Sequence, residues 1–190
     1  MAKSINNETA TENLPAVVPD YSKAMAQFEA SGALTNYLNL PSAAAGKWTI
    51  GSDKDPVPAG TKVAVDATSF QYGWVYWLAG RPIATVMAPC TEPYPEAPTK
   101  TDEGTDIPPA ARLSPQYSFT VAFDSGRKAV VRGGTKGLLF VLQNLMQKVV
   151  ERAQAGETKL NPVVSLESSS YTHKEHGLIH NPKCPVVAWV

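Results

Sequence analysis

The feature that most constrains the fold of this chain is an aromatic run between Phe70 and Leu78, which reads Phe-Gln-Tyr-Gly-Trp-Val-Tyr-Trp-Leu. Successive side chains of a strand point to opposite faces, so a strand here places Phe70, Tyr72, Trp74 and Tyr76 on one face. Such a row forms either the centre of a β core or a platform on which unpaired bases stack. The residues alone leave both interpretations open.

Alternating apolar residues and turn residues predict a chain made mainly of β-hairpins. Ala79-Gly80 and Asp124-Ser125-Gly126 are typical of tight turns between paired strands. A polar turn is also expected near Lys174 to Gly177. The predicted strands are residues 62–67, 70–78, 81–87, 117–123, 127–131, 163–171 and 185–190.

One long helix is predicted from Gly133-Gly134-Thr135 to about Ala155, because leucine and valine residues recur along one stripe. Thr135 is the expected N-cap, and Gly156 is expected to end the helix. The helix precedes the last two predicted strands. This order favours an OB-like five-stranded antiparallel barrel with a capping helix, although other α+β meanders have the same order.

The chain is expected to divide into three parts. Residues 1–20 are polar and read as a flexible N-terminal arm, and residues 21–60 read as a docking segment with short helical turns. The OB-like domain is expected over residues 61–190. Within it, residues 88–115 are rich in proline and acidic side chains and are expected to form a long loop that serves as a mobile flap or a partner-binding surface.

Composition limits the classes of partner. Seventeen basic and seventeen acidic residues among 190 give zero formal net charge, so a polyanion site must be a local patch. No stretch approaches the roughly 20 apolar residues of a membrane span, which predicts a cytoplasmic protein without a membrane partner. Cys90 and Cys184 are too few for a disulfide framework and are expected to be free thiols.

Aromatic and basic residues together suggest a groove for single-stranded DNA, which requires stacking surfaces and cations along the backbone. The alternative interpretations are an ordinary core for the aromatic residues and a solvated surface for the cations. The candidate stacking residues are Tyr72, Trp74, Tyr76, Trp77 and Tyr171. The candidate phosphate contacts are Arg81, Arg127, Lys128, Arg132, Lys136 and Lys174.

The run Gly133-Gly134-Thr135-Lys136-Gly137 at the helix entrance suits a phosphate, because backbone N–H groups and the positive helix end attract anions. It lacks the spacing of a Walker loop, and a flexible strand-to-helix link explains it equally.

Signatures of metal binding and catalysis are weak. His173, His176, His180 and Cys184 have residue types that suit zinc, but their spacing matches no zinc motif, so no metal or cofactor is expected. No Gly-x-Ser-x-Gly elbow is present and Cys184 has no identifiable base, so the chain is expected not to be an enzyme.

Three stretches resemble a family of small, largely uncharacterised proteins of tailed phages and prophages. They are Gly73-Trp74-Val75-Tyr76-Trp77 with Gly80-Arg81-Pro82, Gly133-Gly134-Thr135-Lys136-Gly137, and Ser170-Tyr171-Thr172-His173-Lys174 with the terminal Val186-Val187-Ala188-Trp189. The resemblance implies a phage origin and a role in DNA replication or recombination in the host cytoplasm. It brings no catalytic residues.

The leading hypothesis is therefore a non-catalytic, phage-encoded single-stranded DNA-binding protein that uses base stacking and backbone electrostatics. A host or phage replication protein is a further expected partner, and a homodimer is left open. The main alternative is a protein-binding phage module that inhibits a host factor through the acidic loop, which would act as a DNA mimic. A virion structural role is a third alternative.

Overall fold

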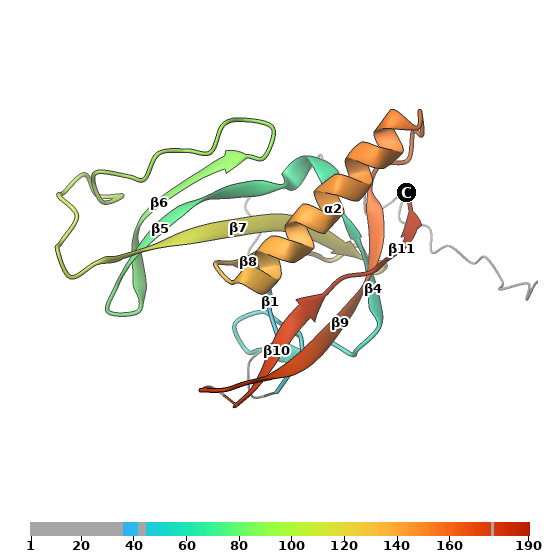
Figure 1. Cartoon of the computed structure of the whole chain (residues 1–190), viewed down its shortest axis with the longest axis horizontal. Helices are drawn as coiled ribbons and strands as arrows, with labels where there is room; N and C mark the ends of the chain where they lie inside the picture. The colour runs from blue at the N-terminus through green and yellow to red at the C-terminus, as the bar shows by residue number, and fades with distance from the viewer. Residues whose placement is uncertain (1–35, 42–44, 176) are drawn as a thin grey trace, which may run out of the picture.

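The computed structural model describes residues 36–41, 45–175 and 177–190 (Figure 1). Within these ranges the chain forms eleven strands, a 3₁₀ turn η1 (Ala67–Ser69) and one long helix α2 (Lys136–Gln154). The helix is the only described one that has more than one turn, and it is not long and apolar enough to cross a membrane. The strands are β1 (Tyr37–Asn39), β2 (Thr49–Ile50), β3 (Asp55–Pro56), β4 (Thr61–Val65), β5 (Gln71–Leu78), β6 (Arg81–Pro89), β7 (Arg112–Phe123), β8 (Lys128–Gly133), β9 (Pro162–His173), β10 (Gly177–Lys183) and β11 (Val186–Trp189).

The described strands form one open sheet in the order β10-β9-β4-β7-β8-β1-β2-β3. Strand β5 pairs with the first half of β7 and carries β6 on its other side, and β11 pairs with the start of β9. The mainly β fold with one principal helix is therefore confirmed. The closed OB-like five-stranded barrel is not confirmed, because the sheet stays open.

The length of two strands explains why the sheet branches and spreads. Strands β7 and β9 have 12 residues each, and each pairs with different neighbours along its length. Strand β7 pairs with β5 over residues 112–118 and with β4 over residues 121–123. Figure 1 shows the result as a long arm of β5, β6 and β7 on one side of α2 and a separate β9–β10 hairpin on another side.

Local chemistry places the first hairpin and the helix where the sequence predicts them. Ala79 and Gly80 both have positive φ, 48° and 78°, as a two-residue turn that follows strand twist requires. The side chain of Thr135 accepts a hydrogen bond from the Leu138 N–H at 3.2 Å, which confirms the N-cap. The helix ends before Gly156, whose φ is 77°.

The C-terminal part differs from the predicted pair of strands. Strand β9 pairs with β10 from His173 and Gly177 onward, with Lys174 and Glu175 in the expected turn, and β11 then returns beside the first residues of β9. The sequence prediction omitted β10, because Asn181, Pro182 and Lys183 give it no apolar alternation.

The core lies between α2 and the sheet. Leu138, Leu142 and Leu145 of α2 pack in one cluster with the buried Phe119 and Val121 of β7. The predicted arm, residues 1–20, lies outside the described residues, as does part of the predicted docking segment. The described part of that segment forms β1, β2 and β3 and adds residues to the same core, namely Leu38, Trp48 and Ile50.

Candidate nucleic-acid interface

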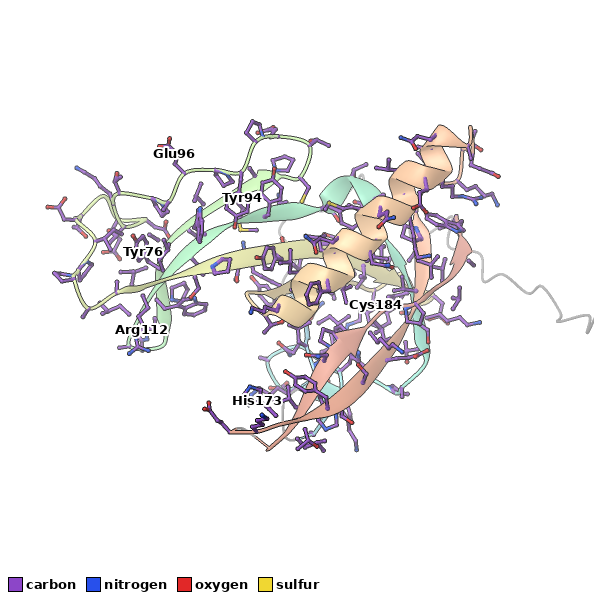
Figure 2. The ribbon with its side chains drawn as sticks, in the orientation of Figure 1. Tyr76, Tyr94, Glu96, Arg112, His173 and Cys184 are labelled. Atoms are coloured by element: carbon purple, nitrogen blue, oxygen red, sulfur yellow. The ribbon has the colours of Figure 1, made fainter. Side chains whose placement is uncertain are left out.

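The two faces of β5 have different surroundings. Tyr72, Trp74 and Tyr76 point to one face, and Val75 and Trp77 point to the other. The segment between β6 and β7 runs along the first face, and Figure 2 shows Tyr94 of this segment above β5. We call residues 90–111 the acidic loop.

The acidic loop occupies the aromatic row that the sequence offered as a stacking platform. The ring of Tyr94 stacks on Tyr72 with a centroid separation of 4.6 Å and an interplanar angle of 16°. It also meets the Trp74 ring edge to face at 5.3 Å. The Tyr94 hydroxyl donates to the Gly73 carbonyl at 2.7 Å, and Trp74 Nε1 donates to the Pro95 carbonyl at 2.9 Å. Tyr72 and Trp74 therefore form a seat for the loop.

Backbone contacts tie the acidic loop to the free edge of β6 as well. The Asp102 N–H donates to the Ile83 carbonyl at 2.9 Å, and the Asp102 carboxylate accepts from the Thr85 N–H at 3.0 Å. These bonds pair edge groups of β6 that would otherwise attract another strand. The loop thus has a defined position in spite of its proline content. It carries five carboxylates and one lysine, which are Glu92, Glu96, Asp102, Glu103, Asp106 and Lys100.

A groove of about 590 Å³ lies on the other face of β5. Trp77 contributes its half-buried indole, and Arg132 of β8 and Tyr37 of β1 line the same groove. No carboxylate is among the described residues that line it. The full lining is Tyr37, Val75, Trp77, Pro82, Thr85, Ser114, Pro115, Gln116, Arg132, Gly133 and Gly134.

Strand register explains how residues so far apart in sequence meet in this groove. Val75 pairs with both Thr85 and Ser114, so these three side chains lie on one face across β6, β5 and β7. Arg132 of β8 pairs with Ser118 of β7 and extends that face to the next strand. Of the sequence-predicted site residues, the structure brings only Trp77 and Arg132 together in the groove.

Arg132 has an unusual environment. Its Nε atom is buried and has no hydrogen-bond partner, and no other buried side-chain nitrogen or oxygen of the described residues shares this property. Gln116 lines the same groove and is only 8% exposed. A charged guanidinium nitrogen without a partner is costly to bury, so this atom marks a position where an acceptor would be stabilised.

The strand-to-helix link forms the wall of the groove beside Arg132. A Cβ at Gly134 would lie 2.5 Å from the Pro115 carbonyl oxygen, so only glycine permits this close approach. Gly133 and Gly134 line the groove, and α2 begins two residues later. The positive end of the helix therefore lies next to the groove.

Sequence reasoning missed three residues of this surface. Arg112 pairs directly with Trp77 and is exposed, and Tyr37 and Gln116 line the groove. Figure 2 shows Arg112 at the outer end of the β5–β7 arm. Arg112 and Gln116 fell in or beside the predicted loop, because the prolines before residue 116 masked the start of β7. The alternation of polar residues at 112, 114, 116 and 118 with apolar residues at 113, 117 and 119 was the signal that could have identified this strand.

The remaining candidate cations and Tyr171 lie elsewhere. Arg81 and Arg127 are exposed at the β5–β6 and β7–β8 turns, and Lys136 is exposed at the start of α2. Tyr171 and Lys174 are exposed on the β9–β10 hairpin.

Lys128 is only 8% exposed and does not line the groove. Desolvation lowers the pKa of its ammonium group, and the nearby Asp66 carboxylate opposes this shift. An ammonium group in this position is poorly placed to meet a phosphate in solution.

The histidine and cysteine residues do not gather into a metal site within the described part of the chain, where no group of three or more such ligands occurs. His173 lies at the end of β9, as Figure 2 shows, whereas Cys184 is buried beside α2. Cys90 and Cys184 are both free thiols. Burial raises the pKa of Cys90 to about 11 and that of Cys184 to about 12, so neither is an activated nucleophile.

Comparison of this chain with family models, with curated proteins and with solved structures gives no match.

Proposed function

We propose that this protein binds single-stranded DNA, without catalysis, in the groove on the Trp77 face of β5. The observation that carries the proposal is the presence of Trp77 and Arg132 in one groove whose described lining has no carboxylate. An aromatic face and a cation in one groove are what a single strand requires, because its bases stack and its phosphates are neutralised.

Charge distribution supports binding on this face in spite of zero net charge. Arg112 pairs with Trp77 at one end of the face, and Arg132 lies across β7 from it. Arg112 and Ser118, the partner of Arg132, are six residues apart on β7, which corresponds to about 20 Å of strand. The acidic loop packs on the opposite face and on the edge of β6, and none of its carboxylates is part of the groove lining.

This mode of binding is the one that OB-type sheets use, in which an exposed strand face presents aromatic and basic side chains. Here we propose it for a branched, open sheet. The phage resemblance supplies the proposed setting, which is DNA replication or recombination in the cytoplasm of an infected cell.

A titration of fluorescently labelled single-stranded and duplex oligonucleotides, at low and moderate salt, tests the proposal. We expect salt-sensitive binding with a preference for the single strand. Trp77→Ala should weaken binding by about 1 to 3 kcal/mol, the range for one stacked base. Trp74→Ala should have little direct effect, because Trp74 faces the acidic loop.

Arg127→Gln is the matched control for charge, since Arg127 is exposed at a turn and does not line the groove. It removes the same charge as Arg132→Gln and should leave affinity nearly unchanged. Absence of single-strand binding by the folded wild-type protein at low salt would overturn the proposal.

A second candidate function is capture of a host protein by the acidic loop. The observation in its favour is that the Tyr94 stack and the hydrogen bonds of Tyr94 and Asp102 give a defined position to a loop that carries five carboxylates, and a DNA mimic needs such an acidic surface. It predicts binding to a basic host protein that is lost when Glu92, Glu96, Asp102, Glu103 and Asp106 are replaced by glutamine or asparagine.

A further inference from the structure

We infer that Arg132 and the adjoining helix entrance form a seat for one phosphate group of a bound strand, whose bases lie along the face toward Trp77. This inference rests on the proposed function, which it deepens by naming where the backbone is held. The ligand chemistry is a phosphate, either a diester within a strand or a monoester at a strand end.

The first argument is the unpaired Nε of Arg132. Arginine stays protonated at all ordinary pH values, so burial cannot be relieved by loss of a proton. Most buried polar atoms in proteins have a partner, and an exception indicates a missing water or ion. Ser114, Thr85 and Gln116 all line the groove, yet none of them bonds this atom.

The second argument is the shape of the donor. A guanidinium presents Nε–H and one Nη–H side by side, and this fork matches two oxygens of a phosphate. A single water would satisfy Nε but would leave the charge without a counter-ion. Arg132 forms no ion pair with a described residue, so it has no carboxylate partner there.

The third argument is the position of the helix entrance. Gly133 and Gly134 line the groove beside Arg132, and α2 follows with 19 residues. Thr135 caps one N–H of the first turn, and other N–H groups of that turn have no acceptor within the helix. These donors and the helix dipole add positive potential at the same wall of the groove.

The fourth argument is the size of the groove. Its volume of about 590 Å³ falls within the range of sites that hold one small organic ligand. Trp77 and Arg132 are part of the same lining. The seat therefore suits one nucleotide unit, with further nucleotides of a strand extending along the face toward Arg112.

The test compares inorganic phosphate, thymidine and thymidine 5′-monophosphate on wild-type protein, Arg132→Gln, Arg132→Lys and the control Arg127→Gln. Thermal unfolding and tryptophan fluorescence report binding, and chloride keeps ionic strength equal. We expect phosphate at tens of millimolar to raise the midpoint of wild type and Arg127→Gln by about one degree or more. Neither Arg132 variant should show the shift, because lysine restores the charge but not the fork.

Two further readouts guard against misfolding of the variants. Arg132→Gln should be at least as stable as wild type without phosphate, because it removes a buried Nε–H donor that has no partner. Thymidine 5′-monophosphate should bind wild type at least tenfold more tightly than thymidine does, and Arg132→Gln should abolish that ratio.

The outcomes separate the seat from the proposed function. Equal responses of wild type and Arg132→Gln to phosphate would overturn the seat, and water would then be the partner of Nε. If the wild-type protein then still bound oligonucleotides, and Trp77→Ala weakened that binding, the proposed function would stand without a phosphate seat at Arg132. A phosphate response without any binding of single strands would support the seat and overturn the function. Tighter binding of a 5′-phosphorylated oligonucleotide than of the same oligonucleotide without the phosphate would identify a terminal monoester as the phosphate that Arg132 binds.

Discussion

Replacement of Tyr94 by alanine is the change that best tests how the acidic loop is held. Tyr94 makes one stacked contact with Tyr72, one edge-to-face contact with Trp74 and one hydrogen bond to the Gly73 carbonyl. Aromatic pairs contribute about 0.5–1.5 kcal/mol each. A hydrogen bond contributes a similar amount. Tyr94→Ala should therefore weaken docking of the loop by about 2–4 kcal/mol.

The global free energy of unfolding should fall by less than this amount. Tyr94 is 42% exposed, and the freed loop regains conformational entropy once its anchor is lost. Loss of global stability is limited to the docking free energy of the loop, because the rest of the sheet can persist with the loop undocked. Tyr94→Phe is the matched control, since it keeps both ring contacts and removes only the hydroxyl bond, for a loss of about 1 kcal/mol.

Hydrogen exchange measured by mass spectrometry separates local from global effects. In Tyr94→Ala the peptides that cover residues 90–111 should lose protection, whereas peptides of α2 should keep wild-type protection. Urea unfolding followed by circular dichroism gives the global change. Wild-type protection of the loop in Tyr94→Ala would refute the reasoning, because contacts other than those of Tyr94, such as the hydrogen bonds of Asp102, Trp74 and Tyr72, would then suffice to hold the loop.

Other changes test the helix entrance and the thiols. Thr135→Ala should lower the free energy of unfolding by about 1 kcal/mol in urea titrations, the cost of an N-cap, and no change would contradict the cap. Gly134→Ala should destabilise the protein and alter the groove, because its Cβ would lie 2.5 Å from the Pro115 carbonyl oxygen, whereas a wild-type melting curve would show that the link relaxes freely. Native Cys184 should resist alkylation at pH 8, since its pKa is raised to about 12, and Cys90, at about 11, should begin to react as pH approaches that value. Because unfolded thiols ionise at lower pH, both groups should make stability fall as pH rises from about 9 to 11 or 12, and replacing Cys184 by alanine should reduce that slope.

The parts of the fold that sequence predicted are those set by local chemistry. The turn at Ala79-Gly80 needs two residues that tolerate positive φ, and Thr135 and Gly156 mark the two ends of α2. Each of these signals acts within a few residues, so each can be found in a single sequence.

The sheet could not be predicted in the same way, since its pairing connects distant segments. Strand β1 lies parallel to β8, although about 90 residues separate them in sequence. Trp48 is 2% exposed and donates its Nε1–H to the Glu167 carbonyl at 2.7 Å. Neither contact has a local signal, and closure into a barrel was inferred only from the order of the strands and the helix along the chain.

In the candidate site, too, the sequence indicates individual residues, whereas strand pairing determines which of them meet. Trp77 and Arg132 were selected by residue type, but their meeting depends on the register of β5, β7 and β8. The sequence left open whether the row from Tyr72 to Tyr76 was a core or a platform. The structure gives a third interpretation, in which the row binds the acidic loop through Tyr94. Hydrophobic periodicity could not predict this contact, because the Tyr94 ring lies about 20 residues away from the row in a segment without regular structure.

The acidic loop also explains why zero net charge is compatible with binding a polyanion. The loop packs on the Tyr72 face through Tyr94 and on the edge of β6 through Asp102, and none of its five carboxylates lines the groove. Near the surface, charges act over about 8–10 Å at physiological salt, so a bound strand responds to Arg112 and Arg132 more than to the sum over the chain. The slope of affinity against salt should then reflect about two phosphate contacts, and each arginine variant should lower it by about one. A slope that remained the same in both variants would place the DNA on another surface.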